Sequence, residues 1–227
     1  MTDDVDHPVR FDVLGCARVA WRHFLPALAL ARGASLTAVA SRDQGRAERF
    51  AREFGCAAVT GYRALLDRDD VDAVYLPLPT GLHARWAAEA LRAGKHVLVE
   101  KPMATTRADA EELVELARRV GRCVAENRMF AHHPQHEAVR ALVADGAIGA
   151  LRVVTSAMAV PPLPTHAPVV RVERPGRGDG LRLPAADQFR EAITAFARAV
   201  RAGAVRPDVL AATLRGLELV DAVREAA

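Results

Sequence analysis

The sequence has few cysteines and no close cysteine pair, and this shortage excludes two classes of protein. Its 227 residues include three cysteines, Cys16, Cys56 and Cys123, which lie far apart and form no Cys-x-x-Cys pair. An odd count without such pairs argues against a disulfide framework and against a zinc site. We therefore expect no metal centre and a reducing, cytoplasmic compartment.

Long apolar runs and clusters of one charge are also missing. The apolar segment 25–31 is far shorter than the ~20 residues that cross a bilayer. Residues 1–4 are acidic and lack the apolar core of a secretory signal, so we expect no membrane association. The 31 basic and 28 acidic residues are spread along the chain and leave a net charge of +3, without the basic stripe that nucleic acid requires. With 51% apolar residues, a packed core is expected.

The first half of the chain alternates short apolar runs with helical patterns. Several runs are continuously apolar, as in strands that are buried on both faces of a parallel sheet. Strands are predicted at 9–14, 36–40, 57–60, 73–76, 96–100 and 123–126. Helices that end at glycine are predicted at 44–54, 82–93 and 106–120, the last with a Thr-x-x-Asp cap. This alternation predicts an α/β fold with a Rossmann-type doubly wound parallel sheet over residues 1–128.

The second half of the chain has a different pattern. We predict a helix at 134–144, a strand at 151–160, short strand-like pieces at 169–173 and 181–183, and helices at 186–202 and 208–225. The Pro-Gly-Arg-Gly-Asp-Gly patch at 175–180 predicts a hairpin turn. These elements indicate a truncated α+β second domain over residues 129–227.

The first predicted strand ends in a turn that suits a phosphate group. Gly15 occupies the first position of a Gly-x-Gly-x-x-Gly/Ala pattern, Ala17 replaces its middle glycine and Ala20 fills its last position. Backbone N–H groups at the start of the following helix would approach a pyrophosphate there. A plain strand-to-helix turn is the alternative, but the surrounding strand–turn–helix–strand order favours dinucleotide binding.

The second predicted strand ends in Ser41 and Arg42. An NAD-selective site usually places an acidic residue here for the ribose 2′-hydroxyl, whereas an arginine beside a hydroxyl suits a 2′-phosphate. The alternative is a solvated surface arginine, in a chain that is rich in arginine. The position favours NADP(H) over NAD(H).

Lysine is nearly absent: Lys95 and Lys101 are the two lysines among the 31 basic residues. Lys101 follows Glu100 at the carboxyl end of the fifth predicted strand, where open α/β sheets bind ligands. An amine that exchanges protons would explain a lysine here, because arginine stays protonated. A surface lysine without a role is the alternative.

Motifs in the same order and spacing resemble those of the Gfo/Idh/MocA oxidoreductases. The motifs are the turn at 15–20, Pro-Leu-Pro-Thr at 77–80 with His83, Ala-Gly-Lys-His-Val at 93–97 and Glu-Lys-Pro at 100–102. Within that family, Trp21-Arg22, Ser41-Arg42 and the run 126–135 resemble the nucleotide-sugar 3-ketoreductases of actinomycete deoxysugar pathways.

The resemblance implies a role for each matching residue. Lys101 would be the proton donor at the reaction centre, and the Lys101–Pro102 bond would be cis. The sugar substrate would lie near His132, His133 and Gln135, for which helix-entry residues on a polar rim are the alternative. The cofactor would lie against Gly15, Cys16, Ala17, Val19, Ala20, Trp21, Arg22, Ser41, Arg42, Leu76, Pro77, Leu78, Pro79, His83, Glu100, Pro102 and Asn127.

The sequence departs from the family after residue 162. Relatives continue there into a Gly-rich segment of the type GGGxLxDxGxYP, which supplies a second catalytic group and much of the substrate pocket. This chain passes almost directly to residues that resemble the last strands and helices of the family, as after an internal deletion. The resemblance implies NADP(H)-dependent reduction of a keto group on a nucleotide-linked sugar. The alternative is a cofactor-binding pseudoenzyme or partner protein. A shortened sheet also predicts a homo-oligomer, because it would expose its edges.

Overall fold

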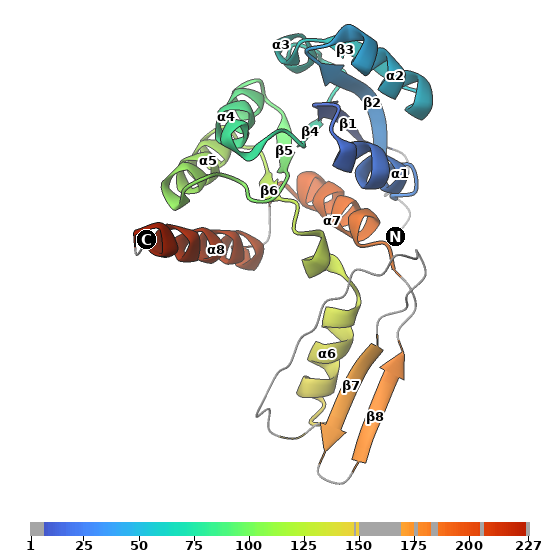
Figure 1. The fold of residues 1–227 in the computed structure, drawn as a ribbon, viewed down its shortest axis with the longest axis vertical. Coiled ribbons are helices and arrows are strands. Elements are labelled where there is room, and N and C mark those ends of the chain that lie inside the picture. Colours follow the sequence, from blue (N-terminus) through green and yellow to red (C-terminus); the bar gives the residue numbers. More distant parts are fainter. Residues whose placement is uncertain are drawn as a thin grey trace.

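The computed structural model describes residues 7–147, 149, 169–174, 177–182, 186–204 and 207–225. Its main sheet has the strand order β3-β2-β1-β4-β5-β6 with every neighbouring pair parallel (Figure 1). This order is that of the Rossmann fold, so the predicted doubly wound sheet is confirmed. The strands are β1 (Val9–Leu14), β2 (Ala34–Ser41), β3 (Ala57–Thr60), β4 (Ala73–Leu76), β5 (His96–Val99) and β6 (Val124–Glu126).

Helices cover both faces of this sheet because its central strands carry apolar side chains on both sides. All four residues of β4 are buried. One core joins η1 (Ala20–Phe24) and α1 (Leu25–Leu28) with the apolar face of α2 (Gln44–Phe54). The opposite core joins α3 (Tyr62–Leu66), α4 (His83–Arg92) and α5 (Arg107–Arg119). The predicted cap of α5 is present: the Thr106 hydroxyl accepts the Asp109 N–H at 3.1 Å.

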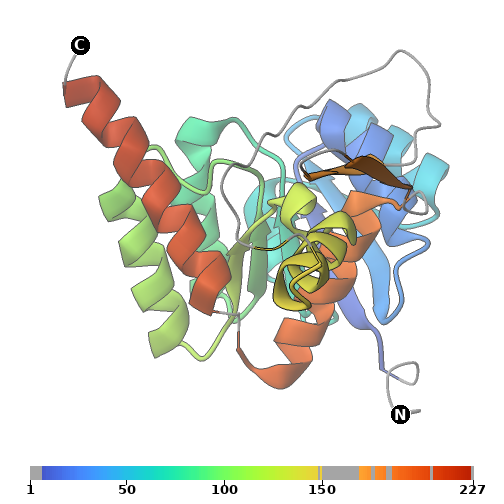
Figure 2. The ribbon, with the colours of Figure 1, turned by 90° about the horizontal axis from the view of Figure 1, so that it is seen from below.

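The two C-terminal helices pack on the sheet unit (Figures 1 and 2). Helix α7 (Gln188–Ala202) places Phe189, Ile193 and Phe196 in the core on the α1 side. Helix α8 (Pro207–Glu225) lies along α5 and buries Leu217 in the other core. By packing, both helices therefore belong with the sheet although they follow residue 128. The division of the chain at that residue stays a prediction.

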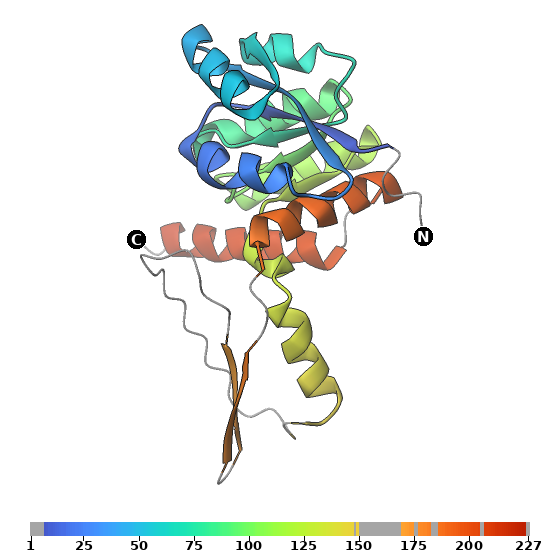
Figure 3. The same ribbon diagram turned by 90° about the vertical axis from the view of Figure 1, so that its right-hand side faces the viewer.

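Helix α6 (Gln135–Ala144) and an antiparallel hairpin of β7 (Val169–Arg174) and β8 (Arg177–Arg182) project from this unit (Figure 3). The short helix η3 (Met129–His132), which precedes α6, packs against α7. The hairpin turn predicted at 175–180 is too long. Residues 177–180 belong to β8 and pair with residues 171–174 of β7, with Arg174 opposite Arg177. The strand predicted at 151–160 lies outside the described residues. The homo-oligomer stays a prediction.

Two further properties concern the described ranges alone. No helix within them is both long enough and apolar enough to cross a membrane. Nor do these ranges bring three His, Cys, Asp or Glu side chains together as ligands for a metal ion.

A buried carboxyl group makes the sheet sensitive to pH. Asp12 lies within β1 with no exposed surface, and the Nε atom of Arg68 lies 3.8 Å from its Oδ2 atom. Burial raises the pKa of Asp12 from 3.8 to about 7, although the Arg68 charge opposes the rise. The unfolded chain thus ionises Asp12 at lower pH than the native protein, so its contribution to stability is complete below pH 3.8 and is lost as pH rises through about 7.

We predict that Asp12→Asn stabilises the protein, relative to the parent, more at pH 8 than at pH 5. The advantage of the variant over the parent should grow by about 2–3 kcal/mol across this interval, because asparagine does not ionise. Urea denaturation at both pH values measures the change. Asp72→Asn is the control: the Arg10 hydrogen bond lowers the pKa of Asp72, so its effect should be the same at pH 5 and pH 8. A constant difference for Asp12→Asn would contradict the prediction.

Candidate functional site

The turn after β1 has the backbone that a phosphate turn requires. Gly15 adopts φ of +121°, which favours glycine, and its N–H donates to the Ala40 carbonyl at 3.0 Å. A Cβ atom at this position would lie 2.6 Å from the Cδ2 atom of Leu78. The chain then enters the helix that continues through η1 and α1, so its first N–H groups face the turn.

No side chain caps the N–H groups at the start of this helix, in contrast to three other helices. Side chains cap α2, α5 and α7: Asp43 accepts the Arg46 N–H at 2.7 Å, and Thr106 and Asp187 act similarly. The helix that leads into η1 begins at Arg18, and the residue before it, Ala17, has no side-chain acceptor for an N–H group. The starts of α3, α4 and α6 lack a side-chain cap as well. An anion can therefore take the place of a capping side chain at this turn.

The end of β2 has the features of a 2′-phosphate site. Ser41 is buried and its Oγ atom accepts the Asp43 N–H at 3.1 Å, which leaves the hydroxyl hydrogen free to donate. Arg42 beside it is exposed. The nearby acidic residue, Asp43, uses its Oδ1 atom to cap α2. The end of β2 therefore presents a cation and a hydroxyl donor at the position where Rossmann folds distinguish NADP(H) from NAD(H).

Other residues predicted at this half of the site are packed into the protein. Cys16 is buried with its Sγ atom 3.7 Å from the Ala40 carbonyl oxygen, and burial raises its pKa to about 11. Trp21 packs edge-on against Phe50 and Phe54 at centroid distances of 4.7 and 5.1 Å, while Arg22 is exposed. The thiol and the indole thus shape the wall behind the turn.

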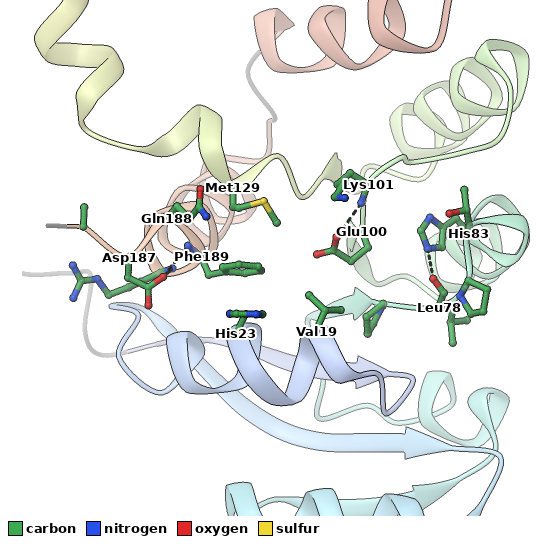
Figure 4. Close-up of a pocket in the computed structure, with 15 residues that line it drawn as sticks. Val19, His23, Leu78, His83, Glu100, Lys101, Met129, Asp187, Gln188 and Phe189 are labelled. Carbon is green, nitrogen blue, oxygen red and sulfur yellow. Dashed lines mark hydrogen bonds between the residues drawn. The ribbon is translucent and has the colours of Figure 1, made fainter. Parts of the chain in front are cut away.

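A cavity of about 1090 Å³ lies at the carboxyl edge of the sheet (Figure 4). The loops after β4 and β5 meet the start of α7 there. Seven residues predicted from the sequence line it: Val19, Pro77, Leu78, Pro79, His83, Glu100 and Lys101.

Glu100 holds the strand ends around this cavity. Its Oε1 atom accepts hydrogen bonds from the Tyr75 hydroxyl and the Asn127 side chain, both at 2.7 Å, and its Oε2 atom accepts the Lys101 N–H at 3.2 Å. Burial, reinforced by the Glu100 charge, raises the pKa of Tyr75 well above its usual value, which keeps the hydroxyl a donor. The three donors tie β4, β5 and β6 together.

Lys101 follows directly, with its side chain at the cavity. Its side chain is exposed, and its ammonium group makes no hydrogen bond or ion pair with the residues the structure describes. The Lys101–Pro102 peptide is cis, as the resemblance implied. Packing therefore does not explain a lysine at position 101. A group bound in the cavity could contact its ammonium group.

The substrate residues predicted from the resemblance do not line this cavity. His132 ends η3, Gln135 begins α6, and the Nδ1 atom of His133 accepts the Gln135 N–H at 3.2 Å. Burial, with a smaller effect of the His136 charge, lowers the pKa of His133. Their roles in substrate binding stay predictions.

Sequence reasoning missed the opposite wall of the cavity. His23 on η1 stacks on Phe189 at the start of α7, with ring centroids 5.3 Å apart and an interplanar angle of 12° (Figure 4). The sequence predicted a helix at 186–202, one residue before the observed cap Asp187, but nothing there showed that α7 packs against the helix after β1. The other lining residues that were missed are Thr80, Met129, Ala186, Gln188 and Arg190.

Comparison with known proteins identifies the family. Residues 9–128 match the family model GFO_IDH_MocA, described as an oxidoreductase family with an NAD-binding Rossmann fold. The chain belongs to the Gfo/Idh/MocA oxidoreductases, which confirms the resemblance seen in its motifs.

Among the similar proteins are 3-reductases of dTDP-linked sugars. The dTDP-3,4-didehydro-2,6-dideoxy-α-D-glucose 3-reductase of Saccharopolyspora spinosa is 54% identical over 157 residues, which are 69% of this chain and 47% of that protein. The enzyme of the same name from Actinomadura kijaniata is 52% identical over 158 residues, which are 70% of this chain and 48% of that protein. The matched part is thus about half the length of these relatives.

A solved structure extends the likeness into the C-terminal part. KijD10, a 3-ketoreductase from Actinomadura kijaniata crystallised with NADP and TDP-benzene, aligns with a TM-score of 0.87 and 34% identity. That alignment covers 96% of this chain and 98% of the other. The structural match therefore reaches α7 and α8, beyond the region of the sequence match.

We predict that Gly15→Ala destabilises the protein by about 1–3 kcal/mol, because φ of +121° is strained for any residue with a Cβ atom. Gly45→Ala is the matched control: Gly45 lies in α2, and its Cβ would meet only Asp43 at 3.6 Å. We expect that variant to be as stable as the parent or up to about 1 kcal/mol more stable. Urea denaturation compares them, and equal midpoints for the two variants would contradict the assignment of the turn.

Proposed function

We propose that this chain binds NADP(H) in preference to NAD(H) and reduces a keto group on a nucleotide-linked sugar, with Lys101 as the proton donor. The observation that carries the proposal is the convergence of three elements around one cavity: the helix after β1, through Val19 and His23, the exposed Lys101, and the beginning of α7. The relatives named as 3-reductases of dTDP-sugars support the choice of substrate class.

Residues at the carboxyl edge of the sheet fit the successive parts of a dinucleotide. The turn at Gly15 would offer N–H groups to the pyrophosphate, and Ser41 and Arg42, beyond the residues that line the cavity, would offer a hydroxyl donor and a cation to the 2′-phosphate. Pro77, Leu78 and Glu100 line the cavity, where the nicotinamide half would lie. When bound, the cofactor would supply the hydride for the carbonyl carbon.

The chain itself would manage the charge on the carbonyl oxygen. Lys101 projects from a backbone whose N–H is bound to Glu100, so its ammonium group is presented at the cavity from a fixed origin. A proton placed on the oxygen by this amine stabilises the charge that develops during reduction.

A second candidate is a cofactor-binding pseudoenzyme or partner protein. The observation that favours it is length: the chain matches about half of its curated relatives, and the predicted Gly-rich segment with a second catalytic group is missing. Cofactor binding without turnover of dTDP-linked ketosugars would favour this alternative.

We predict that Arg42→Ala weakens NADPH binding about tenfold or more and leaves NADH binding nearly unchanged. The loss of a charge-assisted hydrogen bond to the 2′-phosphate accounts for ~1.5–3 kcal/mol. Isothermal titration calorimetry measures both dissociation constants. Arg52→Ala is the control, because Arg52 is another exposed arginine, on α2. Equal affinity of the parent for NADH and NADPH would refute the assignment of this position.

Lys101→Met should lower any ketosugar reductase rate by ~10²–10⁴, because a general acid is lost. NADPH affinity should stay near that of the parent, since the predicted phosphate contacts lie at the other half of the site. Stopped-flow oxidation of NADPH with a dTDP-linked ketosugar measures the rate. A variant that reacts as fast as the parent would show that Lys101 has a structural role.

A further inference from the structure

His83 connects two loops of the candidate site through both of its ring nitrogens. It is the first residue of α4 and only 1% exposed. Its Nε2 atom lies 2.6 Å from the Leu78 carbonyl oxygen (Figure 4). Its Nδ1 atom lies 2.7 Å from the Pro102 carbonyl oxygen. The first carbonyl belongs to the loop after β4 and the second to the loop after β5.

The identity of the partners determines how the ring is used. Carbonyl oxygens accept hydrogen bonds and never donate them. An imidazole with one ring hydrogen would satisfy one loop and leave a lone pair facing the other oxygen. Each ring nitrogen lies within hydrogen-bond distance of one carbonyl oxygen, so the ring connects the two loops through polar contacts on opposite sides.

Each of the two loops leads to a different part of the site. The Leu78 side chain packs against Gly15, because a Cβ atom at position 15 would lie only 2.6 Å from the Leu78 Cδ2 atom. Pro102 follows Lys101, whose own N–H is bound to Glu100. The backbone around Lys101 is therefore held by Glu100 on one side and by His83 on the other.

We propose that His83 is a positioning residue: the polar contacts of its two ring nitrogens hold the loop that carries Lys101 against the loop that supports the phosphate turn. The proposal rests on the proposed function, because it assigns His83 a place in aligning the proton donor with the cofactor. It predicts that hydrogen bonding by the ring, and not its apolar shape, sets the surroundings of the Lys101 amine.

Two variants separate hydrogen bonding from shape. His83→Phe keeps a planar ring but removes both ring nitrogens. His83→Gln keeps two amide hydrogens on a single nitrogen, which cannot reach two carbonyls that lie on opposite sides of the ring. His96→Gln is the matched control, because His96 is partly buried and accepts the Cys123 N–H at 2.9 Å through Nδ1, away from the cavity.

The scarcity of lysine provides a direct probe of the site. Reductive methylation with ¹³C-formaldehyde labels Lys95, Lys101 and the terminal amine, and Lys101→Arg assigns the Lys101 signal. Lys95 is 7% exposed and donates to the Arg68 and Val71 carbonyls, so its signal should differ clearly from that of the exposed Lys101. The position of the Lys101 signal in the cofactor-free protein reports its surroundings without any need for activity.

We expect His83→Phe to move the Lys101 signal and to weaken NADPH binding about tenfold, and His83→Gln to do both to a smaller degree. His96→Gln should change neither. A folded His83→Phe with the Lys101 signal of the parent overturns the proposal, and so does a parent-like His83→Gln if the phenylalanine variant fails to fold. Failure of the parent to bind NADPH would instead refute the proposed function, while the Lys101 signal still decides the role of His83.

Discussion

The geometry of the candidate site depends on the hydrogen bonds that the Glu100 carboxylate accepts. It is buried at the end of β5, and it accepts from Tyr75 on β4, from Asn127 after β6 and from the N–H of Lys101. A buried charge is tolerated when several donors surround it, and removal of one donor leaves part of that charge unpaired. The three strand ends and the backbone of Lys101 are therefore fixed by the same group.

A second buried carboxylate extends this arrangement to the C-terminal part of the chain. Glu126 at the end of β6 accepts the Thr213 hydroxyl of α8 at 2.8 Å, the Met103 N–H at 3.2 Å and the Arg128 guanidinium at 2.9 Å. Together with the apolar face of α7, this explains how a chain that matches about half the length of its relatives still covers both faces of its sheet.

The parts that could be predicted from the sequence are those that local physics determines. The continuously apolar run at β4, the Asp43 and Thr106 caps and the left-handed Gly55 each act within a few residues, and each corresponds to an observed element boundary. The stacking of His23 on Phe189 joins positions far apart in the sequence, and no periodicity connects them. The amphipathic pattern of α7 showed that it buries one face, but not that this face belongs to the sheet unit.

The two lysines show why rarity alone does not identify a functional residue. Lys95 is buried, and its compact ammonium group donates to two carbonyls, of Arg68 and Val71. A guanidinium group is larger and planar, so packing by itself explains a lysine at that position. Lys101 has the opposite surroundings: it is exposed at the cavity and makes no side-chain bond within the described residues. Packing therefore does not distinguish lysine from arginine at 101. The proposed reduction would distinguish them, because an arginine stays protonated and cannot act as a proton donor.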